Sequence, residues 1–163
     1  MIDFAAILAD LDARGLKLAI AESLTGGLLS ATVVDVPGAS KVLLGSIVAY
    51  QNSLKQNLLN ISASELDRFH AVSAETAVAM AQGAIETISS AAGIDPSIVV
   101  GLATTGVAGP DADGVHPVGQ VFIAVVWPGR EPEIRELHLA GSRGEIRSAT
   151  VLATHELLGS LLA

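Results

Sequence analysis

The sequence predicts an α/β fold, a three-layer α/β/α sandwich around a mixed sheet. Hydrophobic residues make up 50% of the 163 residues and charged residues 16%, so the chain can bury a sizeable core. Short β-branched runs alternate with segments whose apolar residues recur at helical spacing. The last three strand-like runs lack helices between them, and because parallel neighbours need a long crossover, the sheet must contain an antiparallel strand. We expect one domain over residues 1–163.

Helices and strands alternate in the first third of the chain. Apolar residues at helical spacing predict a helix from Phe4 to Leu11, which ends near Gly15. The apolar run from Leu16 to Ile20 predicts a short buried strand. The segment from Leu28 to Val34 predicts a helix that stops at the turn of residues 36–38.

The middle of the chain predicts one strand followed by three helices. The β-branched, apolar run from Gly45 to Tyr50 favours the strand. The first helix covers Leu54 to Leu59 and carries Lys55 in its first turn. The second begins at a capping box that starts with Ser62, and the third runs from about Ser73 to Ala92.

Three strands and a final helix complete the prediction. Ser97 to Thr104 is an apolar run that predicts a buried strand. Val118 to Trp127 is apolar on both faces, which favours an interior position in the sheet. Glu133 to Leu139 alternates apolar and polar residues and predicts a strand with one solvated face. The last helix is expected from about Arg143 to Leu162.

Composition excludes several classes of function. The net charge of −8 argues against a nucleic-acid surface, because phosphate binding needs a basic face. The absence of cysteine excludes disulfides, thiolate metal sites and a cysteine nucleophile. No apolar run is long enough to cross a bilayer, and residues 1–4 lack the pattern of a signal peptide. We therefore expect a cytoplasmic chain without membrane or nucleic-acid partners.

Two helical segments carry more apolar residues than one buried face needs. They are the alanine- and leucine-rich stretches at residues 74–92 and 148–162. An apolar face left over on a helix favours self-association. These stretches therefore indicate a self-association face, as in a homo-oligomer, while the oligomeric state itself stays open.

The turn after the first strand, Ala21 to Gly27, is the first candidate for chemistry. A strand, a small polar turn, a glycine pair and a helix place a side chain where ligands gather in open α/β sheets. They also aim backbone N–H groups at the same point. Ser23 is then either a helix N-cap or a nucleophile in an elbow-like turn, and Thr25 can take the cap and leave Ser23 free.

A serine nucleophile needs a base. Lys55 follows a strand end, as Ser23 does, and a buried lysine can lose its proton near neutral pH; the alternative is a solvated helix lysine. Tyr50, the only tyrosine, is either a pocket wall or a strand-end aromatic residue. The four histidines have no neighbours that suggest a triad: His70, His116, His138 and His155.

The segment from Thr105 to Gly109 is a second small-residue loop at a strand end. Its spacing matches neither a Walker loop nor G-x-G-x-x-G, so it is a weak phosphate or oxyanion signal or a plain tight loop. Asp111 and Asp113 suggest a metal, but no full ligand set follows and we expect none. Arg143, at the start of the last helix, is placed to bind an anion or is simply solvated.

Seven short motifs occur together in order along nearly the whole chain. They are AESxTGG at 21–27, VPGAS at 36–40, YxNxxK at 50–55, AVS at 71–73, TGVAGP at 105–110, PVG at 117–119 and GxR at 141–143. Together they resemble the CinA C-terminal domain family, whose enzymatic members are nicotinamide-nucleotide amidases, also called nicotinamide mononucleotide deamidases. Leu24, His116 and Ser142 depart from the family's usual cysteine, lysine and aspartate.

The resemblance implies a mixed five-stranded sheet and hydrolysis of the carboxamide of nicotinamide mononucleotide to nicotinate mononucleotide and ammonia. It implies Ser23 as nucleophile, Lys55 as base and Tyr50 beside them, with no metal or organic cofactor. We hypothesise that backbone N–H groups in the Thr25 to Gly27 turn or near Gly106 bind the oxyanion, and that Arg143 or a helix N-terminus binds the phosphate. The expected substrate contacts are Thr25, Gly26, Gly27, Asn52, Thr105, Gly106, Gly109 and Arg143.

Two further interpretations belong to other classes of protein. A nucleotide-binding module without turnover predicts stabilisation by pyridine nucleotide but no ammonia. A regulatory or scaffolding domain, whose glycine loops only pack, predicts no stabilisation by any pyridine nucleotide.

Overall fold

The computed structural model describes residues 3–162, and its centre is one five-stranded mixed sheet. The strand order is β2-β1-β3-β4-β5. β1 runs parallel to β2 and β3, whereas β4 is antiparallel to β3 and β5. The prediction of a mixed sheet is therefore confirmed. The strands are β1 Lys17–Glu22, β2 Leu43–Val48, β3 Val99–Gly106, β4 Gln120–Val126 and β5 Glu133–His138.

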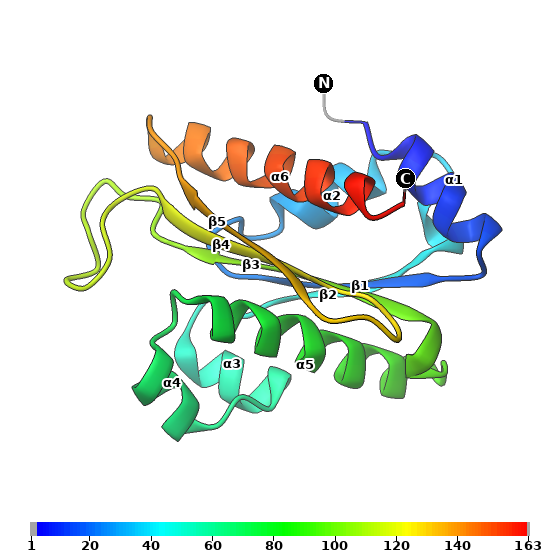
Figure 1. The fold of residues 1–163 in the computed structure, drawn as a ribbon, viewed down its shortest axis with the longest axis horizontal. Helices are drawn as coiled ribbons and strands as arrows, with labels where there is room; N and C mark the ends of the chain where they lie inside the picture. The colour runs from blue at the N-terminus through cyan, green and yellow to red at the C-terminus, as the bar shows by residue number, and fades with distance from the viewer. Residues whose placement is uncertain (1–2, 163) are drawn as a thin grey trace.

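Helices cover both faces of the sheet, which makes the predicted three layers (Figure 1). One outer layer holds α1 Ala5–Ala13, α2 Leu28–Val34 and α6 Arg143–Ser160. The other holds α3 Asn52–Leu59, α4 Ala63–Phe69 and α5 Ala74–Ala92. Two short 3-10 helices lie at Ala39–Lys41 and Pro96–Ile98.

The alternation of side chains along β1 divides the core between the two helical layers. Leu18 and Ile20 belong to the cluster that includes α1, α2 and α6, whereas Ala19 and Ala21 belong to the cluster with α5. The small side chains on the second face let α5 lie close to the strands. A Cβ on Gly101 would come within 2.6 Å of the Ala81 carbonyl oxygen. This glycine is therefore needed for the approach of α5 to β3.

Two strand ends extend further than the sequence pattern predicts. β1 continues to Glu22, which pairs with Val48 on one side and Thr104 on the other. β3 continues through Thr105 and Gly106, which pair with β4 and were expected in a loop. Hydrogen bonding to neighbouring strands extends these ends, and the local sequence does not record that pairing. The extension brings the ends of β1 and β3 to the same edge of the sheet.

The long helix α5 uses its apolar residues within the fold. Ala77, Met80, Ala81 and Ala84 are buried, so the excess expected for a self-association face is absent on this helix. On α6, Leu152 is 44% exposed. Self-association of the chain stays a prediction.

No helix within residues 3–162 combines the length and hydropathy needed to span a bilayer.

Candidate active site

A cavity of about 310 Å³ lies where the ends of β1 and β3 meet the segment after β2. Its wall comes from segments far apart in the sequence, which the parallel pairing of β1 with β2 and β3 brings to one edge. This is the edge at which ligands bind in open α/β sheets. The lining residues are Ser23, Leu24, Tyr50, Gln51, Asn52, Lys55, Ala71, Val72, Thr105, Gly106, Val107, Ala108, Gly109, Asp111, Asp113 and Arg143.

Ser23 follows β1 directly and faces this cavity. Its N–H donates to the Thr104 carbonyl oxygen at 2.9 Å, and the residue is 8% exposed. The N-cap residue of α2 is Gly27, with no side-chain cap bond of its own. The interpretation of Ser23 as a helix N-cap is therefore wrong. Thr25 does not cap either, because its hydroxyl is 2.7 Å from that of Thr104.

Lys55 is the fourth residue of α3 and reaches the same point. Its Nζ donates to Ser23 Oγ at 3.2 Å and to the Ala49 carbonyl oxygen at 2.9 Å. The residue is 1% exposed, so the interpretation as a solvated lysine is wrong. Burial lowers the pKa of Lys55 to about 8. A substantial fraction of the amine is therefore neutral near physiological pH and can accept a proton.

Glu22 supports the turn that carries Ser23, and the sequence reasoning assigned it no role. Its carboxylate is fully buried and accepts hydrogen bonds from the N–H groups of Gly27, Leu29 and Ser30 at 2.8–3.1 Å. The Ser30 hydroxyl donates to it as well. An anion at a helix N-terminus is stabilised by the free N–H groups and the helix dipole. The sequence feature that could have identified Glu22 is an acidic residue a few positions before a glycine pair and a predicted helix.

This arrangement changes two expectations for the substrate contacts. The Gly26 N–H donates to the Ser23 carbonyl oxygen at 3.2 Å, and the Gly27 N–H donates to Glu22. Both amides are engaged in the turn, so neither is an oxyanion donor in this structure. The described lining of the cavity contains neither these glycines nor Thr25. Because Glu22 occupies the N-terminus of α2, that helix end is closed to a substrate phosphate.

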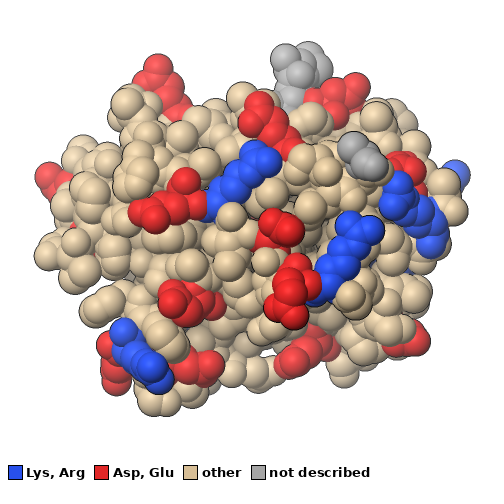
Figure 2. All heavy atoms as spheres, in the orientation of Figure 1, with Lys and Arg blue, Asp and Glu red and all other residues tan. Residues whose placement is uncertain are grey.

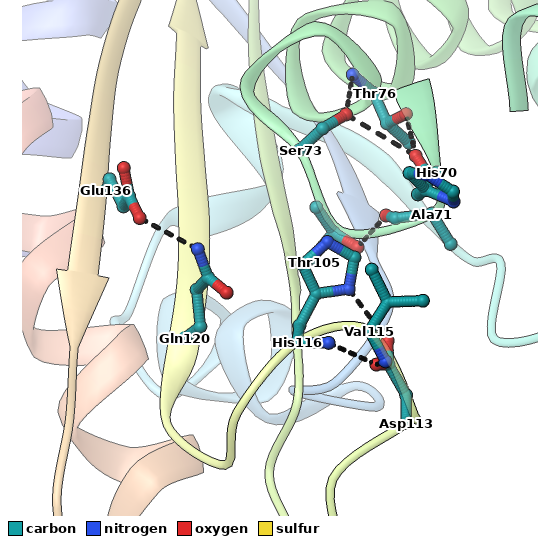
Figure 3. A network of polar contacts seen from close by, with 10 residues as sticks. All are labelled: His70, Ala71, Ser73, Thr76, Thr105, Asp113, Val115, His116, Gln120 and Glu136. Atoms are coloured by element: carbon teal, nitrogen blue, oxygen red, sulfur yellow. Dashed lines mark hydrogen bonds and ion pairs between the residues drawn. The ribbon is translucent and has the colours of Figure 1, made fainter. Parts of the chain in front are cut away.

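The second glycine-containing segment, Thr105 to Gly109, forms another part of the cavity wall. The Thr105 hydroxyl donates to the Ala71 carbonyl oxygen at 2.6 Å and ties β3 to the segment before α5 (Figure 3). A Cβ on Gly106 would lie 2.7 Å from the Gln120 carbonyl oxygen. Gly109 has φ of +82°, and its Cβ would meet Val118 Cγ1 at 2.7 Å. The two glycines therefore let the backbone form this wall.

Arg143 lies at the cavity rim and joins two of its walls. Its guanidinium donates to the Gly109 carbonyl oxygen at 2.8 Å and to the Tyr50 hydroxyl at 2.9 Å. The arginine is exposed and Tyr50 is 52% exposed. Ser142 caps α6 in a capping box and so fixes the first turn that carries Arg143. Asn52 begins α3 on the same rim.

Two acidic residues complete the lining, Asp111 and Asp113. The Asp113 carboxylate is 3.0 Å from His116 Nδ1 and accepts the backbone N–H groups of Val115 and His116 (Figure 3). Burial acts to raise the pKa of Asp113, but these hydrogen bonds outweigh it and lower the pKa to about 2. Residues 3–162 contain no group of three or more acidic, histidine or cysteine side chains that could hold a metal.

Arg147, one turn after Arg143 on α6, is the second residue that the sequence reasoning missed. Its Nε donates to the Leu24 carbonyl oxygen at 3.1 Å, and Nη2 donates to the Thr25 carbonyl oxygen at 2.6 Å. It does not line the cavity. Its spacing of four residues from Arg143 on a predicted helix was the available signal, since such residues share a helix face.

Comparison with known proteins gives the relationship of the whole chain. The model of the CinA C-terminal domain matches residues 4–162. The chain belongs to the CinA C-terminal domain family. It is 43% identical over 150 residues to a competence-damage inducible protein of Desulforamulus reducens, covering 89% of this chain and 34% of that protein. A competence-damage inducible protein of Bacillus subtilis is 45% identical over 134 residues, covering 82% and 30%. The chain thus spans about a third of the length of these curated relatives.

Solved structures of the family have the same fold. A CinA superfamily protein from Escherichia coli is 30% identical with a TM-score of 0.86, covering 96% of this chain and 87% of that chain. The competence/damage inducible protein CihA from Agrobacterium tumefaciens is 32% identical with a TM-score of 0.86, covering 97% and 92%. The predicted α/β fold with a mixed five-stranded sheet is confirmed by these structures.

Proposed function

We propose that the protein is an amidase that hydrolyses the carboxamide of nicotinamide mononucleotide to nicotinate mononucleotide and ammonia. The observation that carries the proposal is the pair of Ser23 Oγ and Lys55 Nζ, 3.2 Å apart, in two buried residues that line one cavity. A hydroxyl within reach of an amine of lowered pKa is the arrangement that activates a nucleophile. Family membership and the cation at the rim support the choice of a nucleotide amide.

The first half of the reaction forms an acyl-enzyme. Neutral Lys55 takes the proton of the Ser23 hydroxyl while the oxygen attacks the amide carbon. The C–N bond then breaks, and the Lys55 ammonium gives its proton to the departing nitrogen, which leaves as ammonia. Each proton that Lys55 receives is passed on, so it returns to the neutral form.

The second half releases the acid. A water molecule gives a proton to Lys55 while its oxygen attacks the acyl carbon. The Ser23 oxygen then leaves and takes that proton back. Nicotinate mononucleotide is released, and both residues return to their starting states without a metal or an organic cofactor.

Leu24 is our candidate for an oxyanion donor in place of the two glycines. Within residues 3–162 its backbone N–H has no hydrogen-bond acceptor, and the residue lines the cavity. The N–H of the residue after the nucleophile has this role in other serine hydrolases with an elbow-like turn. The phosphate is assigned to Arg143, because its guanidinium is exposed at the rim and planar donors suit phosphate oxygens.

Ammonia release from nicotinamide mononucleotide tests the proposal, with wild type measured beside Ser23→Ala and Ser53→Ala. Ser53 is an exposed serine of α3 outside the cavity lining, so its replacement is the matched control. We expect Ser23→Ala to lose at least about 10³-fold in kcat, the scale seen when a serine nucleophile is removed. Ser53→Ala should keep wild-type turnover.

Three outcomes contradict the proposal. Release of ammonia by Ser23→Ala at the wild-type rate would show that Ser23 is not the nucleophile. No release by a folded wild type whose melting temperature nicotinamide mononucleotide still raises replaces the amidase with a binding module. If neither release nor a shift is seen, only the fold and the family remain.

A further inference from the structure

The turn that carries the nucleophile is held from outside the cavity by one side chain. Arg147 is half-buried, and its Nε and Nη2 both approach the Thr25 carbonyl oxygen, at 3.2 and 2.6 Å. Its Nε also donates to the Leu24 carbonyl oxygen at 3.1 Å. These are charge-assisted bonds from a rigid planar donor, which are stronger and more directional than neutral ones. Two successive peptide groups after Ser23 are therefore fixed by a residue 122 or 123 positions away.

The Thr25–Gly26 peptide group has a hydrogen-bond partner on its opposite side too. In a planar trans peptide the C=O and the following N–H point in opposite directions. With the Thr25 carbonyl directed to Arg147, the Gly26 N–H points the other way, and it donates to the Ser23 carbonyl oxygen. That bond in turn sets the peptide group between Ser23 and Leu24. Through these peptide groups and the bond between them, the Arg147 contacts therefore restrict the positions of both Ser23 and the Leu24 N–H.

Arg147 and Arg143 have separate roles on one helix. They are four residues apart on α6 and so lie on one face of it. Arg143 lines the cavity, where it can meet a ligand, whereas Arg147 lies outside the lining and donates its hydrogen bonds to backbone carbonyl oxygens. The hydrogen bonds of Arg147 therefore connect it to the site through the Ser23 turn.

We propose that Arg147 is a positioning residue that holds the Ser23–Gly27 turn, and with it Ser23 Oγ and the Leu24 N–H, in the geometry needed for attack. This inference rests on the proposed amidase function. Its kinetic signature is a loss in kcat with little change in KM. Displacement of reacting groups by about 1 Å can cost 10²-fold in rate, even when binding contacts are intact.

The experiment compares Arg147→Met and Arg147→Lys with wild type in ammonia release. We expect Arg147→Met to lose about 10- to 100-fold in kcat with KM within about 2-fold. The pH midpoint should be unchanged, because the pKa of Lys55 is lowered by burial, which Arg147 does not provide. Arg147→Lys keeps the positive charge but lacks the planar guanidinium with its several N–H donors. Its kcat should therefore lie between those of Arg147→Met and wild type.

The matched control is Arg14→Met. The Arg14 guanidinium also donates to a backbone carbonyl of a distant segment, that of Leu162 at 2.8 Å, but far from the cavity lining. Its replacement removes the same kind of tie and should leave kcat and KM unchanged. A loss of kcat in Arg14→Met equal to that in Arg147→Met overturns the positioning role, because it would show that Arg147 contributes only to the stability of the fold.

Hydrogen exchange separates failure of this inference from failure of the proposed function. If the turn is held as described, Arg147→Met loses amide protection at Gly26 and Gly27, while the strands of the sheet keep theirs. This measurement needs no turnover, so it decides the inference even if the wild type releases no ammonia. Unchanged protection of the two amides, or a rise in KM at constant kcat, overturns it.

Discussion

Lys55 illustrates how the fold changes the chemistry of a single residue. A lysine on an exposed helix stays protonated to about pH 10, but Lys55 is 1% exposed, and burial lowers its pKa to about 8. Desolvation penalises only the charged form, so the environment shifts the residue toward a base. Ser23 Oγ, 3.2 Å away, is the hydroxyl that would give its proton to this base in the proposed reaction.

The pH dependence of the reaction follows from this pKa. If neutral Lys55 is the base, kcat/KM for ammonia release rises about tenfold per pH unit below about pH 8 and levels off above it. Lys55→Met should lose activity at every pH. A profile that is flat from pH 6 to 9, or a Lys55→Met variant with wild-type turnover, contradicts the assignment.

The same pKa predicts how stability changes with pH. The folded pKa lies below the unfolded value of 10.5, so between about pH 8 and 10.5 the unfolded state binds more protons and stability of the wild type rises with pH. Below about pH 8 both states are protonated and the full cost of burying the charge is present. Urea unfolding should therefore show that any stability advantage of Lys55→Met at pH 7 shrinks as the pH approaches 10.5.

At the scale of elements, α2 depends on a carboxylate that comes from the preceding strand. Glu22 of β1 is fully buried and accepts from three backbone N–H groups at the start of α2. The helix has only seven residues, and isolated helices of that length are not stable in water. Glu22 thus links β1, the Ser23–Gly27 turn and α2 into one unit.

We expect Glu22→Gln to lower the free energy of unfolding by about 2 kcal/mol, because the amide offers one acceptor oxygen instead of two and points an NH₂ at N–H donors. Urea unfolding measures the loss. Glu65→Gln is the matched control, since Glu65 also caps a helix, α4, but is exposed to water. A loss in Glu65→Gln equal to that in Glu22→Gln would show that burial of the cap does not matter.

At the scale of the whole molecule, charge is distributed without a basic region on the face seen in Figure 2. Lys and Arg side chains there lie among Asp and Glu side chains. The net charge is −8. A protein binds nucleic acid by neutralising phosphates with clustered cations, and its affinity falls as salt rises.

We therefore expect no binding of the chain to duplex DNA. Fluorescence anisotropy of a labelled duplex at low and physiological salt measures this, with a basic DNA-binding protein as positive control. A rise in anisotropy at micromolar protein that salt abolishes would contradict the expectation.

Light scattering of the protein tests the expected self-association. A monomer at micromolar concentration would contradict that expectation.

The sequence by itself determined the order and type of the helices and strands, because hydrophobic period and capping residues are local. The predicted capping box at Ser62 shows this, since it is completed by Glu65, three residues later in the chain. It also predicted the family through motifs at Ser23, Lys55 and Arg143, which the structure brings to one cavity.

Only the tertiary structure decided which groups in the nucleophile turn are free. Gly26 and Gly27 were expected to offer their amides to a substrate, yet the Ser23 carbonyl and the Glu22 carboxylate already accept them. Arg147 reaches the same turn from α6, more than 120 positions along the chain. Hydrogen-bond partners and burial are set by contacts between distant segments, and no local pattern in the sequence records them.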